Sequence, residues 1–332
     1  MRKLLLGTTA LAAAATLSAN AALADVSISG YYEWRYESRS SQNSTYDGTR
    51  FGNDSEIVFS FSNKTDSGLT IGMVQELQAD DGDTAIDEAS LSISGGFGKL
   101  ILGGNDGVND QGFGIAANNL VSEEMYTISG ANAASGYTHD MKIKNGDMAN
   151  LGGDDNKITY ITPSMSGLTA GISYTDSGYA GSTDTTEVAA MYAMEAGGAK
   201  ITLGVVSGTT EAASQDKDSS VVGVQIDSGD ISVIVSQSEY EASGEDEQGI
   251  DFGVSYKVND ALKIVGYTTE VEDDSTSEEY SNTGFEAVYT IASGLAAIVT
   301  IEDYDYKKGS ATDNSAANDS GTESKLTIKA TF

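Results

Sequence analysis

The sequence predicts an all-β fold, a sixteen-stranded antiparallel β-barrel that spans a membrane. Three observations lead to this prediction: a final strand that ends on an aromatic residue, an amino-terminal export signal, and polar connections that alternate between short and long. The last seven residues alternate apolar and polar side chains up to Phe332. The chain therefore ends on a strand rather than on a polar tail.

In an exported chain, a terminal aromatic residue can also act as a signal for membrane insertion. Barrels of the outer membrane typically finish on an alternating strand with a carboxy-terminal aromatic residue that the insertion machinery reads. The end of this chain resembles that pattern, and we expect Phe332 to be its assembly signal.

Residues 1–24 have the three parts of a secretory signal peptide. Arg2 and Lys3 make the start basic, an apolar stretch follows, and small residues precede Asp25. Cleavage before Asp25 would remove two basic residues and no acidic one, which lowers the formal net charge from −32 to about −34. Nucleic acid is not expected as a partner, because so acidic a surface repels a phosphate backbone.

The rest of the chain, 25–332, is expected to be one domain. It has no cysteine, so packing and hydrogen bonds must hold the fold without disulfides. Its single proline, Pro163, lies between two expected strands, and we find no proline-rich linker. No apolar run approaches the roughly 20 residues of a spanning helix, so a membrane span would have to be a barrel.

Strands of alternating polarity recur along the chain. In the first, the apolar parity holds Val26, Ile28, Tyr32, Trp34 and Tyr36, and the polar parity holds Ser27, Ser29, Glu33, Arg35 and Glu37. Many aromatic residues fit the girdles at membrane interfaces: Tyr31, Tyr32, Trp34, Tyr36, Tyr174, Tyr192, Tyr256, Tyr267 and Tyr289. Seven hairpins follow the first strand, with turns of Gly, Asn and Asp that supply the required backbone angles.

Longer polar connections separate the hairpins. We place them at 39–54, 78–87, 103–155, 175–186, 207–219, 236–249, 270–280 and 304–323. A first strand, seven hairpins and a last strand make sixteen strands, an even number that leaves both termini on the periplasmic side. The alternative is a secreted all-β adhesin or surface-layer protein, which would also have short alternating strands.

Three segments, the carboxy-terminal strand and two others, resemble the general, non-specific porins of proteobacterial outer membranes, especially the alphaproteobacterial type. The run 94–103 matches the family's strand, turn and strand at Gly95, Phe97, Gly98, Leu100, Leu102 and Gly103. The run 156–168 is similar to the family segment after the constriction loop, with Tyr160, Pro163 and Gly167 at the usual spacing.

This resemblance implies a homotrimer embedded in outer-membrane lipid, whose barrels let small hydrophilic solutes and ions diffuse passively. It also implies that the long third loop, 103–155, folds into the lumen and narrows it. One departure concerns the pore wall: many members have arginine where this chain has Gly104.

The long loop is also unusual by itself, because loops above about 12 to 15 residues are mostly functional or disordered. It is rich in carboxylates, and we choose Asp106, Asp110, Glu123 and Glu124 as constriction residues, with a helical turn near 120–126. Acidic side chains that line a pore favour cations. We therefore predict a cation preference.

Arg35 and Arg50, and less directly Arg39, are the arginines we place on the opposing wall. Facing carboxylates across a narrow aqueous gap, they would create a transverse field. The alternative is that the three arginines simply pair with Glu33, Glu37 or acidic loop residues.

Acidic clusters also raise the question of a metal. Asp80, Asp81 and Asp83, near Asp87, offer oxygen ligands that suit Ca²⁺, although the spacing differs from that of an EF-hand. Structural calcium therefore stays open, and no other cofactor is expected. We expect no enzyme, because His139 is the only histidine and no hydrolase or nucleotide motif occurs; a hydrolase built around His139 is the alternative.

Overall fold

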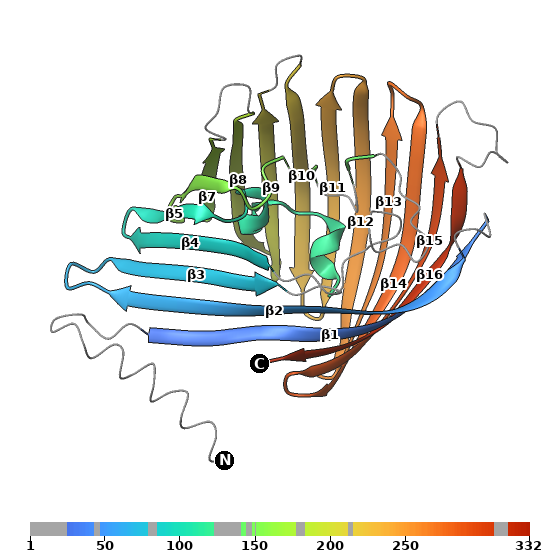
Figure 1. The fold of residues 1–332 in the computed structure, drawn as a ribbon, viewed down its shortest axis with the longest axis horizontal. Coiled ribbons are helices and arrows are strands. Elements are labelled where there is room, and N and C mark those ends of the chain that lie inside the picture. Colours follow the sequence, from blue (N-terminus) through green and yellow to red (C-terminus); the bar gives the residue numbers. More distant parts are fainter. Residues whose placement is uncertain are drawn as a thin grey trace.

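The fold is described from a computed structural model, in residues 25–42, 47–78, 85–122, 141–143, 148–149, 151–176, 183–211, 215–308 and 318–332. The described residues form sixteen strands that close into one barrel (Figure 1). Each strand pairs antiparallel with its neighbours in sequence, and β1 closes the ring by pairing with β16. The predicted fold class is confirmed.

The strands differ in length around the ring. The first eight are β1 (Asp25–Ser41), β2 (Gly48–Lys64), β3 (Thr70–Gln78), β4 (Ala85–Gly95), β5 (Gly98–Gly104), β6 (Asn156–Ile161), β7 (Leu168–Thr175) and β8 (Thr185–Ala196). The remaining eight are β9 (Ala199–Thr210), β10 (Lys217–Ser228), β11 (Ile231–Ala242), β12 (Glu245–Asn259), β13 (Leu262–Asp273), β14 (Glu278–Ala292), β15 (Leu295–Lys307) and β16 (Asp319–Thr331).

The two faces of the wall differ in polarity, as the alternation predicts. Val26, Ile28 and Trp34 of β1 are exposed on the outside, whereas Glu33, between them in sequence, is buried inside. Because successive side chains of a strand point to opposite faces, the outer surface is apolar and the inner one polar. Among the described residues, no helix is long and apolar enough to cross a membrane.

The start of β1 and the end of β16 lie at the end of the barrel that has the short turns. The backbone N–H of Phe332 donates to the carbonyl of Gly30 at 3.1 Å, and the N–H of Gly30 donates back to Phe332 at 3.2 Å. The β14–β15 turn beside them ends on Gly294, whose φ of +73° favours glycine. We call this the short-turn end and the opposite one the long-loop end.

Two expected long connections are strand instead. Over 236–249, β11 and β12 continue to a turn of only Ser243 and Gly244, and over 270–280 only four residues separate β13 from β14. Polar side chains made these segments look like loops. Beyond the lipid, however, a paired strand needs no apolar outer face, because backbone hydrogen bonds to its neighbours sustain it.

Two of the expected girdle tyrosines also face inward. The Tyr31 hydroxyl donates to Asp54 at 3.3 Å, and Tyr267 is buried and hydrogen-bonded to Glu302. Both lie on the inward parity of their strands, so lipid contact was the wrong interpretation.

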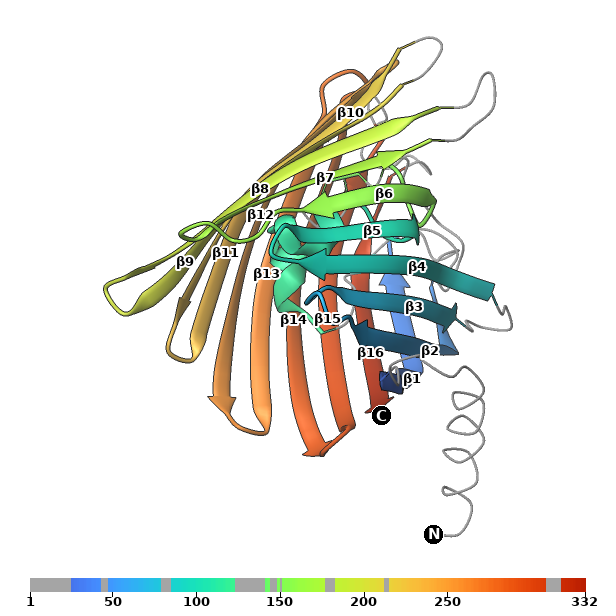
Figure 2. The same cartoon turned by 90° about the vertical axis from the view of Figure 1, so that its left-hand side faces the viewer.

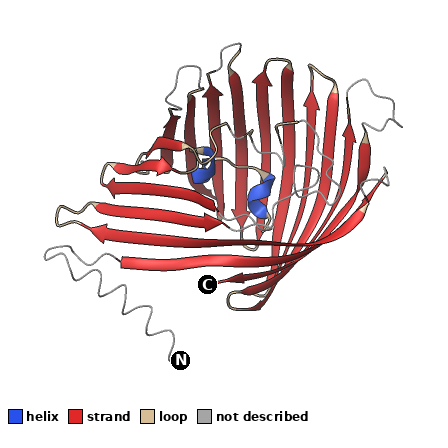
Figure 3. Cartoon of the chain, in the orientation of Figure 1, coloured by secondary structure: helices blue, strands red, loops and turns tan. Residues whose placement is uncertain are grey.

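The described part of the connection from β5 to β6 lies inside the ring (Figures 2 and 3). It includes a one-turn π-helix, η2 (Asn109–Phe113), and a 3-10 helix, η3 (Ala117–Leu120). η3 ends at Leu120, and most of the helical turn predicted near 120–126 lies outside the described residues. Buried side chains of the connection pack against inward residues of the wall, for example Ile115 and Leu120 against Ile234 and Val265. This packing between loop and wall is the apolar core of the molecule.

Candidate functional site: the interior loop and the charged wall

The loop lies in a groove made by inward-facing glycines. Gly204 of β9 and Gly223 of β10 are direct partners in the sheet, so neither strand has a side chain there. A Cβ on Gly223 would lie 2.0 Å from the carbonyl oxygen of Ile115, and one on Gly204 would lie 2.4 Å from that of Phe113. The backbone of the loop therefore touches the backbone of the wall, which only glycine allows.

Buried carboxylates of the wall hold the loop by its backbone. Glu247 of β12 accepts the N–H of Lys142 on both carboxylate oxygens at 2.8 Å, and the N–H of Ile143 at 2.8 Å. Asp251 of the same strand accepts the N–H of Ala117. Charge-assisted bonds of this kind are stronger than neutral ones. The carboxylates thus satisfy loop donors that have no secondary structure to bind.

Two further wall residues extend this attachment. Glu286 of β14 accepts the N–H of Ser122 at 2.9 and 3.1 Å. The ammonium of Lys263, on β13, donates to the carbonyl of Leu120 and the hydroxyl of Ser122, both at 3.0 Å. The segment from Ala117 to Ser122, which contains η3, is therefore attached to β12, β13 and β14.

An acidic group lies where the loop leaves and rejoins the wall. The N–H of Asp106 donates to Glu88 of β4 at 3.0 Å, and the carboxylates of Glu88, Asp106 and Asp154 come within 4.8 Å of one another. Burial, followed by the negative charge of Asp154, raises the pKa of Asp106 above its ordinary value, and nearby Lys157 partly opposes this.

A second acidic group lies nearby on the wall. Carboxylate oxygens of Glu56 on β2, Glu76 on β3 and Asp87 on β4 also approach within 4.8 Å of one another. All three are partly exposed. Groups of this geometry are common without a bound ion, and their direct effect is a concentration of negative charge beside the start of the loop.

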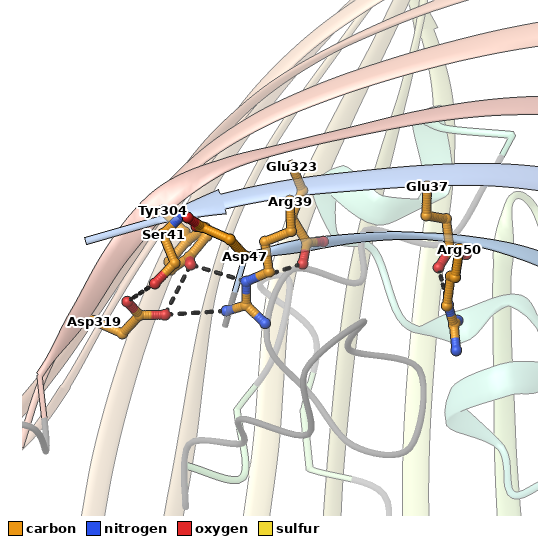
Figure 4. Close-up of polar contacts among 8 residues, drawn as sticks. All are labelled: Glu37, Arg39, Ser41, Asp47, Arg50, Tyr304, Asp319 and Glu323. Atoms are coloured by element: carbon orange, nitrogen blue, oxygen red, sulfur yellow. Dashed lines mark hydrogen bonds and ion pairs between the residues drawn. The ribbon is translucent and has the colours of Figure 1, made fainter. Parts of the chain in front are cut away.

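Arg35 and Arg50 face the interior, but each has carboxylate partners. Arg35 lies 2.6 Å from Glu33 and 2.7 Å from Asp54, whereas Arg50 pairs with Glu37 across the β1–β2 ladder (Figure 4). The alternative raised by the sequence, local pairing, is the arrangement observed. This part of the wall is therefore a mixture of both charges.

Arg39 is buried in a cluster of hydrogen bonds and ion pairs. Its guanidinium donates to Tyr304 at 2.9 Å and to Asp319 at 3.2 Å, and lies 3.5 Å from Glu323 (Figure 4). The Tyr304 hydroxyl donates to Asp319 at 2.8 Å. The side chains of Arg39 and Asp319 are only 1% and 0% exposed. This cluster joins β1 to β15 and β16, where the barrel closes.

Comparison with known proteins identifies the family. The family model described as Gram-negative porin matches residues 7–309. The chain belongs to this porin family. Its members are outer-membrane channels, which favours the channel over the adhesin and is consistent with a non-enzymatic protein. No curated relative matches the chain.

Solved structures of several other proteins have the same fold. The anion-selective porin from Comamonas acidovorans is 17% identical, with a TM-score of 0.67 over 93% of this chain and all of that one. The trimer form of OmpT, an outer membrane protein of Vibrio cholerae, is 15% identical, with a TM-score of 0.65 over 94% of this chain and all of that one. A mutant porin of Rh. blastica is 17% identical, with a TM-score of 0.63 over 93% of this chain and all of that one.

The predicted site residues of this porin have different surroundings. Asp106 lies in the acidic group at the start of the loop, and Asp110 is exposed in η2 with its carboxylate 3.2 Å from Asn109. Glu123 and Glu124 lie outside the described residues. So do Asp80, Asp81 and Asp83, and calcium at those three positions stays a prediction.

The carboxylates that hold the loop in this porin are not among the residues predicted from the sequence. Glu247, Asp251 and Glu286 lie within strands, on the inward parity, where a polar side chain is expected. Alternation with outward apolar neighbours could have placed Asp251 and Glu286 inside, whereas Glu247 lies between Asp246 and Gln248, where that signal is missing. Their loop partners, more than a hundred residues away in sequence, could not be predicted from it.

Proposed function

We propose that this porin is a passive diffusion channel for small hydrophilic solutes and ions, with a preference for cations. The observation that supports it is a difference in exposure across the interior. Under the loop, the side chains of Glu247 and Asp251 are buried, each at 1% exposure. On the opposite wall, the side chains of Arg50 and Glu37 are 23% and 19% exposed. The partial exposure of this pair supports an aqueous path between the wall of β1 and β2 and the loop.

The preference for cations is supported by the balance of charge along this path. The arginines of β1 and β2 are offset by carboxylates within the same wall. The acidic groups around Glu76 and Asp106 include six carboxylates, and Gly104 stands where many porins have arginine. An excess of carboxylates along a narrow path attracts cations and repels anions. Asp106 and Asp110 are the constriction residues of this proposal, with Glu123 and Glu124.

The assembly and export of the channel are part of the same proposal. Export would use the signal peptide 1–24, and Phe332 would direct insertion. A homotrimer is supported by the shared fold with the trimer form of OmpT. Purified folded protein should migrate as a trimer in a mild-detergent gel and as a monomer after boiling.

The test is a planar-bilayer recording under a KCl gradient. Stepwise conductance with a cation-selective reversal potential is the expected result. Steps with anion selectivity would leave the channel and reject the cation preference. A folded, heat-modifiable preparation that gives no steps would reject the channel itself.

A further inference from the structure

A hollow at the long-loop end of the barrel differs in charge from the rest of the rim. It encloses about 510 Å³, and its lining is Lys142, Met148, Ala149, Leu151, Thr183, Thr210, Lys217 and Tyr240. The loop supplies the first four of these residues and the ends of β9, β10 and β11 supply three others. A solute that enters from the long-loop end reaches this hollow before the constriction.

The floor of the hollow is held in place. Gly208 of β9 has no side chain, and Leu151 and Met148 approach to 3.1 and 3.4 Å of the position its Cβ would take. The Thr185 hydroxyl binds the carbonyl of Leu151 at 3.5 Å and the hydroxyl of Thr210 at 2.8 Å. The hollow is thus preformed, with a volume in the range typical of small-molecule sites.

The charge of the lining reverses that of the protein as a whole. Two of its residues are lysines and none is acidic, in a chain of 50 acidic and 18 basic residues. Two other hollows of the same rim are lined by several carboxylates, among them Glu272 and Asp305 in one and Glu239 and Glu241 in the other. Lys142 lies 3.4 Å from Glu245, which partly offsets its charge. Within the described residues, none of the ion pairs includes Lys217.

We propose that this hollow binds a small organic carboxylate with an apolar or aromatic face. The ammonium groups of Lys142 and Lys217 would attract the carboxylate. Thr183, Thr210 and the Tyr240 hydroxyl offer hydrogen bonds, and Met148 with Leu151 forms an apolar floor. The lysines offset the acidic rim at one place and keep such a solute at the mouth of the channel. The inference rests on the proposed channel but not on its cation preference.

The experiment uses 4-hydroxybenzoate as the probe and 4-hydroxybenzamide as its uncharged counterpart. Added to the long-loop side of the trimer in a bilayer, the carboxylate should interrupt the KCl current at lower concentration than the amide. Lys217→Gln and Lys142→Gln should each weaken this block roughly two- to fivefold, as expected for exposed charges. Lys257→Gln is the matched control, because it removes the same charge at the short-turn end, where Lys257 pairs with Asp260 at 2.8 Å.

Saturation-transfer NMR on the detergent-solubilised protein measures binding without requiring conductance. Binding of the carboxylate that weakens in the Lys142 and Lys217 variants, but not in the Lys257 variant, supports the site. Equal binding of carboxylate and amide, or equal loss in all three variants, overturns it even if the channel conducts. Absence of conductance together with specific binding would reject the proposed function and keep the site.

Discussion

Gly223→Ala tests whether contact with the wall sets the position of the loop. The added Cβ would start 2.0 Å from the Ile115 oxygen, and ordinary contact begins at 3.4 Å, so one side must move by about 1.4 Å. β10 is hydrogen-bonded to Gly204 on β9 and to Ser236 on β11, which prevents the wall from receding. The loop should therefore move toward the lumen.

The expected result is a folded barrel with smaller single-channel conductance and a lower size limit for solutes. Overpacking of this kind typically costs about 1–3 kcal/mol, too little to prevent folding of a closed barrel. Gly266→Ala on β13 is the control, because its Cβ would meet nothing within 4 Å and the change of residue type is the same. Conductance of the Gly223 variant equal to that of the Gly266 variant would refute the reasoning.

Three further predictions concern the charged residues. Arg39→Ala should destabilise the barrel by about 3–5 kcal/mol, because Asp319 stays buried without its cation; heat-modified gel mobility should change at a lower temperature. Glu247→Ala should increase open-channel current noise, since it leaves two buried loop N–H groups unpaired at about 1–3 kcal/mol each. The raised pKa of Asp106 means that this carboxyl takes up a proton above the ordinary carboxyl pKa and loses its charge as pH falls. Cation selectivity, measured as reversal potential against pH, should decline early in wild type and later in Asp106→Asn.

Each of these three predictions has a control variant or an outcome that would contradict it. Arg50→Ala should cost no more than about 1 kcal/mol, because its pair with Glu37 is partly exposed, so equal losses at Arg39 and Arg50 would contradict a structural role for Arg39. Unchanged noise in Glu247→Ala would mean that the loop does not depend on this carboxylate. For Asp106, burial favours the protonated carboxyl in the folded state. The destabilisation that its buried charge causes is therefore relieved as the pH falls. An identical pH profile in the Asn variant would assign the decline to other carboxylates.

The predicted strands were recovered where polarity alternates, and were missed where both faces become polar. The turn at Ser243 and Gly244 illustrates this limit: beyond the lipid, the outer face gives no hydrophobic signal, so strand was interpreted as loop. Parity placed Arg35 inside the barrel but could not choose between an open arginine wall and local pairing. That choice depended on the distances of Arg35 to Glu33, two residues away on the same strand, and to Asp54, which the register between β1 and β2 brings beside it.

By itself, the sequence determined the barrel, its strand number and the presence of an unusual acidic loop, because these follow from local alternation and connection length. Only the tertiary structure decided how the loop is held, which arginines are compensated and where a basic hollow lies. The role of Gly204 and Gly223 cannot be predicted from their own strands, because it depends on the loop backbone that lies against them. Closure of the ring brings residues far apart in sequence within hydrogen-bonding distance, and it is that closure which creates the site.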